Sequence, residues 1–165
     1  ARPGNEADEA VFRLNVLACY VKRRCILFLK GMEGGKVDYG DFRMAAEELF
    51  RCLSSRGIRA VFHSEGETAA LPASSVLTLY DFLEEYVEDA VLAGAVHISC
   101  HLDLLPHGSC LSLMAGESFW IEDFIRDMEK DRRFTKDGVS MTIKDLGYSL
   151  SVEICVRGRK EDTYG

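Results

Sequence analysis

The sequence predicts an α+β fold: a two-layer sandwich in which helices cover one face of a mixed sheet, preceded by a long N-terminal helix. Two observations lead to this prediction. Four segments place apolar residues at helical spacing, and the segments between them alternate apolar and polar residues, as half-buried strands do. Helices and strand pairs follow one another along the chain without an internal repeat, which is typical of a sheet covered by helices.

The expected elements are bounded by residues that favour helix ends and turns. Helices are expected at 6–30, 41–55, 72–93 and 118–133, and strands at 58–63, 96–104, 110–115, 139–143 and 148–156. Asp38 or Asp41 can cap the second helix, and Pro72 suits the first turn of the third. Gly57 and Gly94 stop these two helices. A short turn containing proline and glycine joins the two central strands into a hairpin.

The first predicted helix has a wide apolar surface. Phe12, Val16 and Cys19 lie on one face, and a second apolar stripe lies beside it. Gly31 is expected to cap this helix, and the four glycines within residues 31–40 predict a loop. Such a helix and linker are typical of a dimerisation element that stands apart from the sandwich. We therefore expect a dimerisation helix with its linker (1–35), a main domain (36–157) and a flexible tail (158–165).

Composition excludes several classes of protein. The chain has 165 residues, 47% of them hydrophobic and 28% charged, as in one globular domain. Its net charge of −7 argues against nucleic-acid binding, which needs a basic surface. We expect no membrane contact within this sequence, because no stretch approaches the ~20 apolar residues of a membrane span. Since it begins at Ala1 and not at Met, we expect a fragment of a longer protein.

The six cysteines form no short-spaced pair, which argues against a zinc site. Most of them lie within apolar runs, and we predict buried, reduced thiols that pack in the core. They are Cys19, Cys25, Cys52, Cys100, Cys110 and Cys155.

Two polar groups allow both a functional and a structural interpretation. His97, His101 and Asp103 fall on one face of the strand 96–104, because side chains alternate along a strand. A metal site or an exposed polar face would both fit, and we favour the exposed face. The basic triplet 22–24 could bind a phosphate or an acidic partner, but we favour the polar edge of a coiled-coil-like helix.

The third predicted helix carries two acidic residues at a functionally suggestive spacing. Glu85 and Asp89 are four residues apart and therefore share one face of the helix. Gly94 follows in a turn of small residues, and Gly116 follows the second strand of the central hairpin.

These motifs and the order of elements resemble the ATP-binding domain of sensor histidine kinases, in the group that includes gyrase and MutL. The resemblance covers about 41–156, and the helix 6–30 resembles the second helix of a histidine-kinase dimerisation hairpin. It implies that Glu85 stands for the family's catalytic Glu, which orients a water or a hydroxyl. Asp89 stands for the Asn that binds Mg²⁺, and Gly94 and Gly116 are implied as vestigial nucleotide-binding positions.

The sequence departs from the family at each nucleotide motif. Asp89 can ligate Mg²⁺ but adds a negative charge where phosphates would bind. The Asp that recognises adenine is replaced by Met114 or Ala115, and the glycine-rich lid retains only Gly138. No phosphoacceptor histidine is present, since none precedes His63. We also hypothesise that Trp120, with Phe119 and Phe124, fills the place of adenine.

The resemblance implies the cytoplasmic domain of a bacterial sensor histidine kinase-like protein, either free or attached to a membrane anchor. With a degenerate site, we expect a pseudo-kinase or scaffold that needs no cofactor, forms a homodimer through its N-terminal helix, and contacts a response regulator or another signalling protein. One alternative is a divergent active kinase domain that binds ATP and Mg²⁺. Another is an unrelated α+β interaction module.

Overall fold

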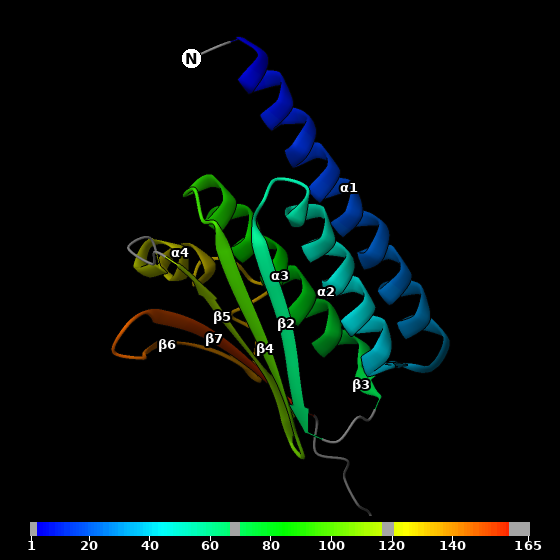
Figure 1. Cartoon of the computed structure of the whole chain (residues 1–165). Coiled ribbons are helices and arrows are strands. Elements are labelled where there is room, and N and C mark those ends of the chain that lie inside the picture. Colours follow the sequence, from blue (N-terminus) through cyan, green and yellow to red (C-terminus); the bar gives the residue numbers. More distant parts are fainter. Residues whose placement is uncertain (1–2, 67–69, 117–120, 159–165) are drawn as a thin grey trace, which may run out of the picture.

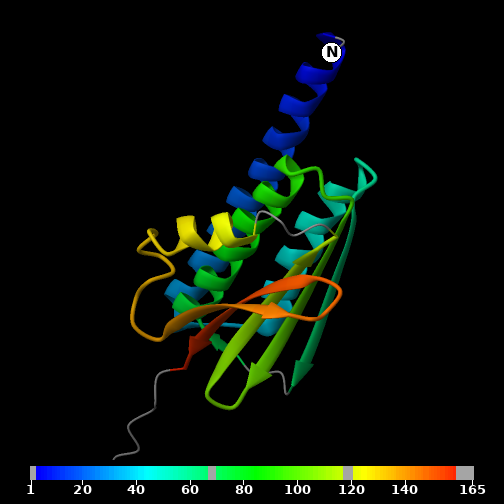
Figure 2. The same ribbon diagram turned by 90° about the vertical axis from the view of Figure 1, so that its left-hand side faces the viewer.

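The computed structural model describes residues 3–66, 70–116 and 121–158, with only the backbone of residues 3–5. Three helices cover one face of a five-stranded sheet, and Figure 2 shows these helices behind the strands. They are α1 (Pro3–Gly34), α2 (Tyr39–Ser54) and α3 (Ala73–Leu92). A short fourth helix, α4 (Ile121–Met128), packs against α3 (Figure 1). The predicted α+β sandwich with a long N-terminal helix is confirmed.

The main sheet is mixed, in the order β2-β4-β5-β7-β6. Its strands are β2 (Arg59–Gly66), β4 (His97–Leu105), β5 (Gly108–Ala115), β6 (Val139–Asp145) and β7 (Leu150–Arg157). The edge strand β2 pairs parallel with β4, through a crossover that contains α3, and the other three pairs are antiparallel. Two further strands, β1 (Lys36–Val37) and β3 (Leu71–Pro72), form a small antiparallel pair that was not predicted.

One face of the sheet faces the helices and the other is open. In β4, Ile98, Cys100 and Leu102 are fully buried beneath the helices, as their alternation predicts. His101 and Asp103 lie on the opposite face, where they are half-buried. His97, His101 and Asp103 therefore share the face that points away from the helices, as predicted, but they are half-buried and not exposed.

The first helix packs on the sandwich, contrary to the expectation that it stands apart. Phe12, Val16 and Leu27 belong to the same apolar core as the residues of α2 and α3. Figure 1 shows α1 running alongside α2 and α3, with its first turns projecting beyond them. The reason is the wide apolar surface of α1: one side of this surface is buried against other helices of the same chain.

The basic triplet lies along the edge of α1 where this helix packs on α2 and α3, as the favoured interpretation expects. Lys22 and Arg23 both contact Glu48 of α2, and Arg24 contacts Asp81 of α3. These side chains therefore point toward the neighbouring helices.

Several predicted helix ends differ from the observed ones, and three of the differences have a visible local cause or consequence. Helix α1 continues through Gly31 to Gly34, and Gly35, with φ +71°, follows it. Helix α2 begins earlier than predicted, with Asp38 as its cap, since the Asp38 carboxylate accepts from the Gly40 N–H at 2.7 Å. Helix α4 ends at Met128, and the residues predicted to continue it to 133 form turns.

The prediction of reduced, buried cysteines is wrong for Cys110, Cys155 and Cys25, and Cys52 is only half-buried. Cys110 and Cys155 face each other across β5 and β7 and form a disulfide. Cys25 is exposed on α1, whereas Cys19 and Cys100 are buried as expected. The disulfide pair lies on the open face of the sheet, where strand alternation places every second residue.

Candidate functional site

Helix α3 carries the two acidic residues singled out in the sequence. It runs from Pro72, its N-cap residue, to Ala93 and ends in a left-handed Gly94 with φ +80°. Glu85 and Asp89 are both half-buried, one turn apart on the side of α3 nearest α4 and the segment that follows it. The predicted placement on one helical face is therefore observed.

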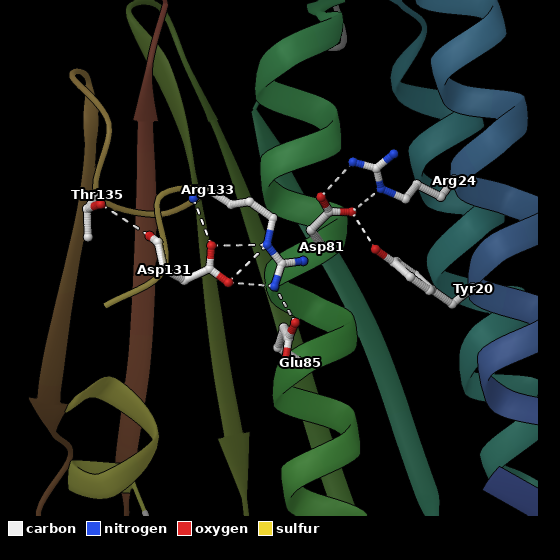
Figure 3. A network of polar contacts seen from close by, with 7 residues as sticks. All are labelled: Tyr20, Arg24, Asp81, Glu85, Asp131, Arg133 and Thr135. Atoms are coloured by element: carbon white, nitrogen blue, oxygen red, sulfur yellow. Dashed lines mark hydrogen bonds and ion pairs between the residues drawn. The ribbon is translucent and has the colours of Figure 1, made fainter. Parts of the chain in front are cut away.

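An arginine from a distant part of the chain binds Glu85 (Figure 3). The Arg133 Nη2 donates to the Glu85 Oε1, across 48 positions of sequence. Its Nε and Nη2 also donate to both carboxylate oxygens of Asp131, at 2.7–3.2 Å. The guanidinium therefore lies between two carboxylates, one from α3 and one from the segment after α4.

The segment around Arg133 is further held in place by local contacts. Asp131 also accepts from the backbone N–H of Arg133 at 2.9 Å, and the backbone carbonyl of Asp131 accepts from the Thr135 hydroxyl at 3.2 Å. The Arg133 guanidinium stacks over the ring of Phe134 at 4.9 Å. Hydrogen bonds from Arg133 hold the pKa of Asp131 below its usual range, and the Asp131 and Glu85 carboxylates raise the pKa of Arg133.

Asp89 has a different electrostatic environment. Burial raises its pKa, and the neighbouring charges of Glu85, Glu88 and Asp127 add to the shift. The surroundings of Asp89 therefore disfavour its ionised form. A cation bound at Asp89 would favour the ionised form instead.

Aromatic side chains fill the space between α3 and the segment that contains α4. Phe82 packs edge-on against Phe124 and Phe134, with ring centroids 5.5 and 5.3 Å apart, and Tyr86 packs against Phe124 at 5.5 Å. All four rings are essentially buried. Of the three aromatic residues hypothesised to replace adenine, Phe124 belongs to this cluster, whereas Phe119 and Trp120 lie outside the described residues.

The two predicted glycine positions have clear structural roles. Gly94 caps α3: its N–H donates to the Val91 carbonyl at 3.0 Å, and the next N–H, of Ala95, donates to Ala90 at 2.9 Å. Gly116 ends β5, and its N–H donates to the His97 carbonyl at 3.3 Å. Both are exposed, and helix capping and strand pairing account for their presence.

A pocket of about 400 Å³ lies on the other side of α3, against α1. Its wall is mostly apolar, with Phe12, Val16 and Leu17 from α1 and the carboxyl of Glu84 from α3. Burial raises the pKa of Glu84 to about 7, and the charges of Glu85 and Glu88 contribute. This pocket is separate from the aromatic cluster around Phe124.

Another ion pair fixes α3 to α1. The buried Asp81 carboxylate accepts from Arg24 at 2.7 and 3.0 Å and from the Tyr20 hydroxyl at 2.8 Å. Figure 3 shows Arg24 and Arg133 reaching α3 from opposite sides. Helix α3 is therefore held between two arginines, a feature that the sequence alone did not indicate.

Sequence reasoning missed the partners of Glu85. Neither Arg133 nor Asp131 is among the predicted site residues. The one available signal was a run of charged residues after α4, which is far from Glu85 in sequence.

No helix among the described residues has the length and the apolar character needed to cross a membrane.

The fold was compared with known proteins. No family model matches the chain, and no curated protein matches it either. Solved structures do match. The blue-light activated histidine kinase of Erythrobacter litoralis aligns with a TM-score of 0.57 at 11% identity, over 89% of this chain. The chain spans only 55% of that kinase.

Two further kinases align with the chain. The Acinetobacter baumannii histidine kinase AdeS matches at a TM-score of 0.52 and 8% identity, covering 91% of this chain and 82% of that one. The ATP-binding domain of PrrB from Mycobacterium tuberculosis matches at 0.52 and 12% identity, covering 74% and 96%. The chain therefore has the fold of histidine-kinase ATP-binding catalytic domains.

Proposed function

We propose that this chain is the cytoplasmic domain of a bacterial sensor histidine kinase-like signalling protein, with a degenerate nucleotide site and a scaffold or pseudo-kinase role. The contact between Arg133 and Glu85 is the main support. The resemblance assigns Glu85 to the helical face that meets the nucleotide. Here a guanidinium of the same chain already neutralises this carboxylate and ties it to Asp131.

The packing around α3 supports the same proposal. The aromatic cluster of Phe82, Phe124 and Phe134 is buried next to the segment that carries Arg133. A nucleotide at this place would have to displace packed rings and break an ion pair. Both changes have a cost in free energy that the family's open, glycine-lined site does not have.

One observation favours the alternative of an active, Mg²⁺-dependent domain. Asp89 lies among Glu85, Glu88 and Asp127, and its pKa is raised. Mg²⁺ bound at Asp89 would relieve this repulsion. The two functions therefore differ in whether Mg²⁺ and ATP bind near Asp89.

Calorimetric titration with ATP and with a non-hydrolysable analogue, with and without Mg²⁺, separates the two functions. For the degenerate domain we expect no binding heat at millimolar nucleotide. Two arginine variants extend the test: Arg133→Ala removes the guanidinium that binds Glu85, and Arg132→Ala removes the exposed neighbour as a matched control.

The outcomes are distinct. Binding that appears in Arg133→Ala but not in Arg132→Ala would identify Arg133 as the group that blocks the site. Micromolar, Mg²⁺-dependent binding by the unmodified chain, lost in Glu85→Ala or Asp89→Ala, would overturn the proposal in favour of the active kinase domain.

The exposed face of α1 supports a homodimer as part of this function. Seven residues on this face alternate in steps of three and four, as the core positions of a coiled coil do. They are Val11, Leu14, Ala18, Val21, Cys25, Phe28 and Met32, here called the α1 stripe, and all are exposed. The opposite face of α1 is buried in its own chain, so this stripe remains for a second copy.

The other expected partners follow from the same proposal. A response regulator or another signalling protein would bind the dimer, and the acidic net charge does not favour nucleic acid. We keep 1–35 as the dimerisation helix with its linker, 36–157 as the kinase-like domain and 158–165 as a tail. Residues 159–165 lie outside the described residues.

A further inference from the structure

The open face of the sheet carries a row of polar side chains that the proposed function does not use. Cys110 on β5 lies opposite Cys155 on β7. On the other side of Cys110, Asp103 of β4 is its cross-strand neighbour. This face points away from α1, α2 and α3 (Figure 2), and is therefore remote from Glu85 and the aromatic cluster.

The two cysteines have a third possible metal ligand beside them. Glu153 precedes Cys155 by two residues on the same face of β7, and its carboxylate and the two sulfurs all lie within 4.8 Å of one another. All three side chains are half-buried. Glu153 accepts from Ser112 at 3.0 Å and from Lys144 at 2.7 Å, both through Oε2, so that Oε1 can still serve as a ligand atom.

We propose that Cys110, Cys155 and Glu153 form a redox-gated site for a thiophilic divalent cation, with Zn²⁺ as the reference ion. The oxidised pair is the disulfide seen in the structure. A dithiol reductant gives up two electrons and two protons, so that the S–S bond is replaced by two thiols and the reductant becomes a cyclic disulfide. The cation then displaces both thiol protons and binds two thiolates and one carboxylate.

The backbone geometry suits this change. The Cα atoms of Cys110 and Cys155 are 4.1 Å apart, as in a close cross-strand pair. Two thiolates on one tetrahedral Zn²⁺ lie about 3.8 Å apart, given a Zn–S bond of about 2.3 Å. Side-chain rotation alone can supply this separation once the S–S bond is broken. A water would complete the four ligands.

A purely structural disulfide is the simplest other explanation, and it leaves Glu153 unexplained. A disulfide that only stabilises the fold needs no carboxylate, yet Lys144 and Ser112 hold the Glu153 carboxylate next to the sulfurs. A second polar cluster on this face, formed by Glu65, His101 and Asp103, competes for the same ion. Two sulfur ligands favour Zn²⁺ at the cysteine pair, because Zn²⁺ prefers thiolates to carboxylates in structural sites.

The test uses the full chain without nucleotide, so its result does not depend on the proposed kinase-like function. Protein reduced with a dithiol and desalted without oxygen is titrated with Zn²⁺ against a chromophoric chelator. Co²⁺ serves as a spectroscopic probe, because thiolate ligands give it a charge-transfer band that carboxylates do not. A parallel sample is oxidised, and a thiol count verifies its disulfide.

We expect one Zn²⁺ per reduced chain and none at this site in the oxidised chain. Cys110→Ser should abolish both the binding and the Co²⁺ charge-transfer band, whereas Cys52→Ser, which removes a free thiol on α2, should change neither. Glu153→Gln should weaken Zn²⁺ binding at least about tenfold, as loss of even a supporting contact does. Glu153→Gln keeps the size of the side chain, so this variant still tests the site if Cys110→Ser proves unstable.

Several results would overturn the proposal. Reduced protein that binds no Zn²⁺, or oxidised protein that binds it equally well, would contradict a redox-gated site. A Co²⁺ complex without the charge-transfer band would exclude thiolate ligands. Binding that survives Cys110→Ser and is lost in His101→Ala would assign the ion to the Glu65, His101 and Asp103 cluster.

Discussion

Tyr20 of α1 and Tyr80 of α3 pack against each other with ring centroids 5.5 Å apart, but their hydroxyl groups differ. The Tyr20 hydroxyl donates to Asp81 at 2.8 Å. The Tyr80 hydroxyl is buried, and within the described part of the chain it has no hydrogen-bond partner. A buried hydroxyl without a partner costs free energy that an apolar group of the same shape does not.

We therefore predict opposite effects for two identical substitutions. Tyr80→Phe should raise the free energy of unfolding by about 1 kcal/mol, because it removes an unsatisfied hydroxyl. Tyr20→Phe should lower the free energy of unfolding by about 1–2 kcal/mol, because the charged Asp81 carboxylate loses a hydrogen bond. Urea unfolding of both variants measures this. A destabilised Tyr80→Phe variant would mean that its hydroxyl is bound after all.

The buried carboxyl of Glu84 predicts a dependence of stability on pH. Its pKa is raised to about 7 by burial and then by Glu85 and Glu88, so the folded chain keeps this proton at pH values where the unfolded chain has lost it. Stability is then highest below the unfolded pKa of about 4.3, falls as pH rises toward 7, and stays reduced above it.

Glu84→Gln should remove this part of the pH dependence. At pH 8 the variant should be more stable than the original chain by up to about 3 kcal/mol, since each pKa unit corresponds to about 1.4 kcal/mol. At pH 4 the two should differ little. Chemical unfolding at both pH values checks this, and an equal difference at the two would exclude titration of Glu84 as its cause.

At the scale of elements, the contact between α1 and the start of α3 depends on a glycine. A Cβ placed on Gly31 would lie 2.4 Å from the Cβ of Ala73, closer than two carbons can approach. Gly34, in the last turn of the same helix, has nothing within 4 Å of such a Cβ. The two glycines therefore differ in packing and share the low helix propensity of glycine.

Alanine at these two positions should have opposite effects on thermal stability. Gly31→Ala should lower the free energy of unfolding by about 1–3 kcal/mol, because the helices must separate. Gly34→Ala should be neutral or stabilising, by at most about 1 kcal/mol, through helix propensity. Thermal unfolding followed by circular dichroism compares the two variants. Equal effects would show that α1 and α3 can move apart at Ala73 with little loss in the free energy of unfolding.

This glycine also explains why one helix end was predicted incorrectly. The sequence offers Gly31, Gly34 and Gly35 as possible caps, and the first was chosen. Its missing side chain serves the contact with α3, and the left-handed turn falls on Gly35. By contrast, the segments of the main sheet are long enough to show either alternation or, at 58–63, a run of β-branched and aromatic residues. The strands 36–37 and 71–72 are too short to show any period.

The candidate site was predictable only for residues that lie close together in the sequence. A spacing of four residues places Glu85 and Asp89 on one face of α3, whatever surrounds them. The pairing of Arg133 with Glu85 spans 48 positions, and that of Cys110 with Cys155 spans 45. Pairs at such separations depend on how the sheet and helices assemble, which one sequence does not indicate.

For the whole molecule, the α1 stripe predicts the oligomeric state. We expect a dimer of about twice 18.5 kDa, because a row of exposed apolar residues gains free energy when a second copy covers it. Val21→Glu combined with Phe28→Glu should give monomers that remain folded, since both side chains are about half exposed in the single chain. Sedimentation velocity measures the mass.

The control for this prediction is Val96→Glu. Val96 is 73% exposed and does not belong to the α1 stripe, so one glutamate at this position should leave the dimer intact. A chain that is monomeric at high micromolar concentration, or a double variant that still dimerises, would contradict a dimer through the stripe.

The parallel pairing of β2 with β4 has a consequence for the order of folding. Strands β4 and β5 meet through a tight turn at Leu105 and Gly108, so their hairpin can close early. Arg59 of β2 meets His97 only after the whole of α3 has crossed over between them. We infer that β2 joins a sheet already assembled from the C-terminal strands, and that the edge strand nearest the N-terminus is the last to dock and the first to detach.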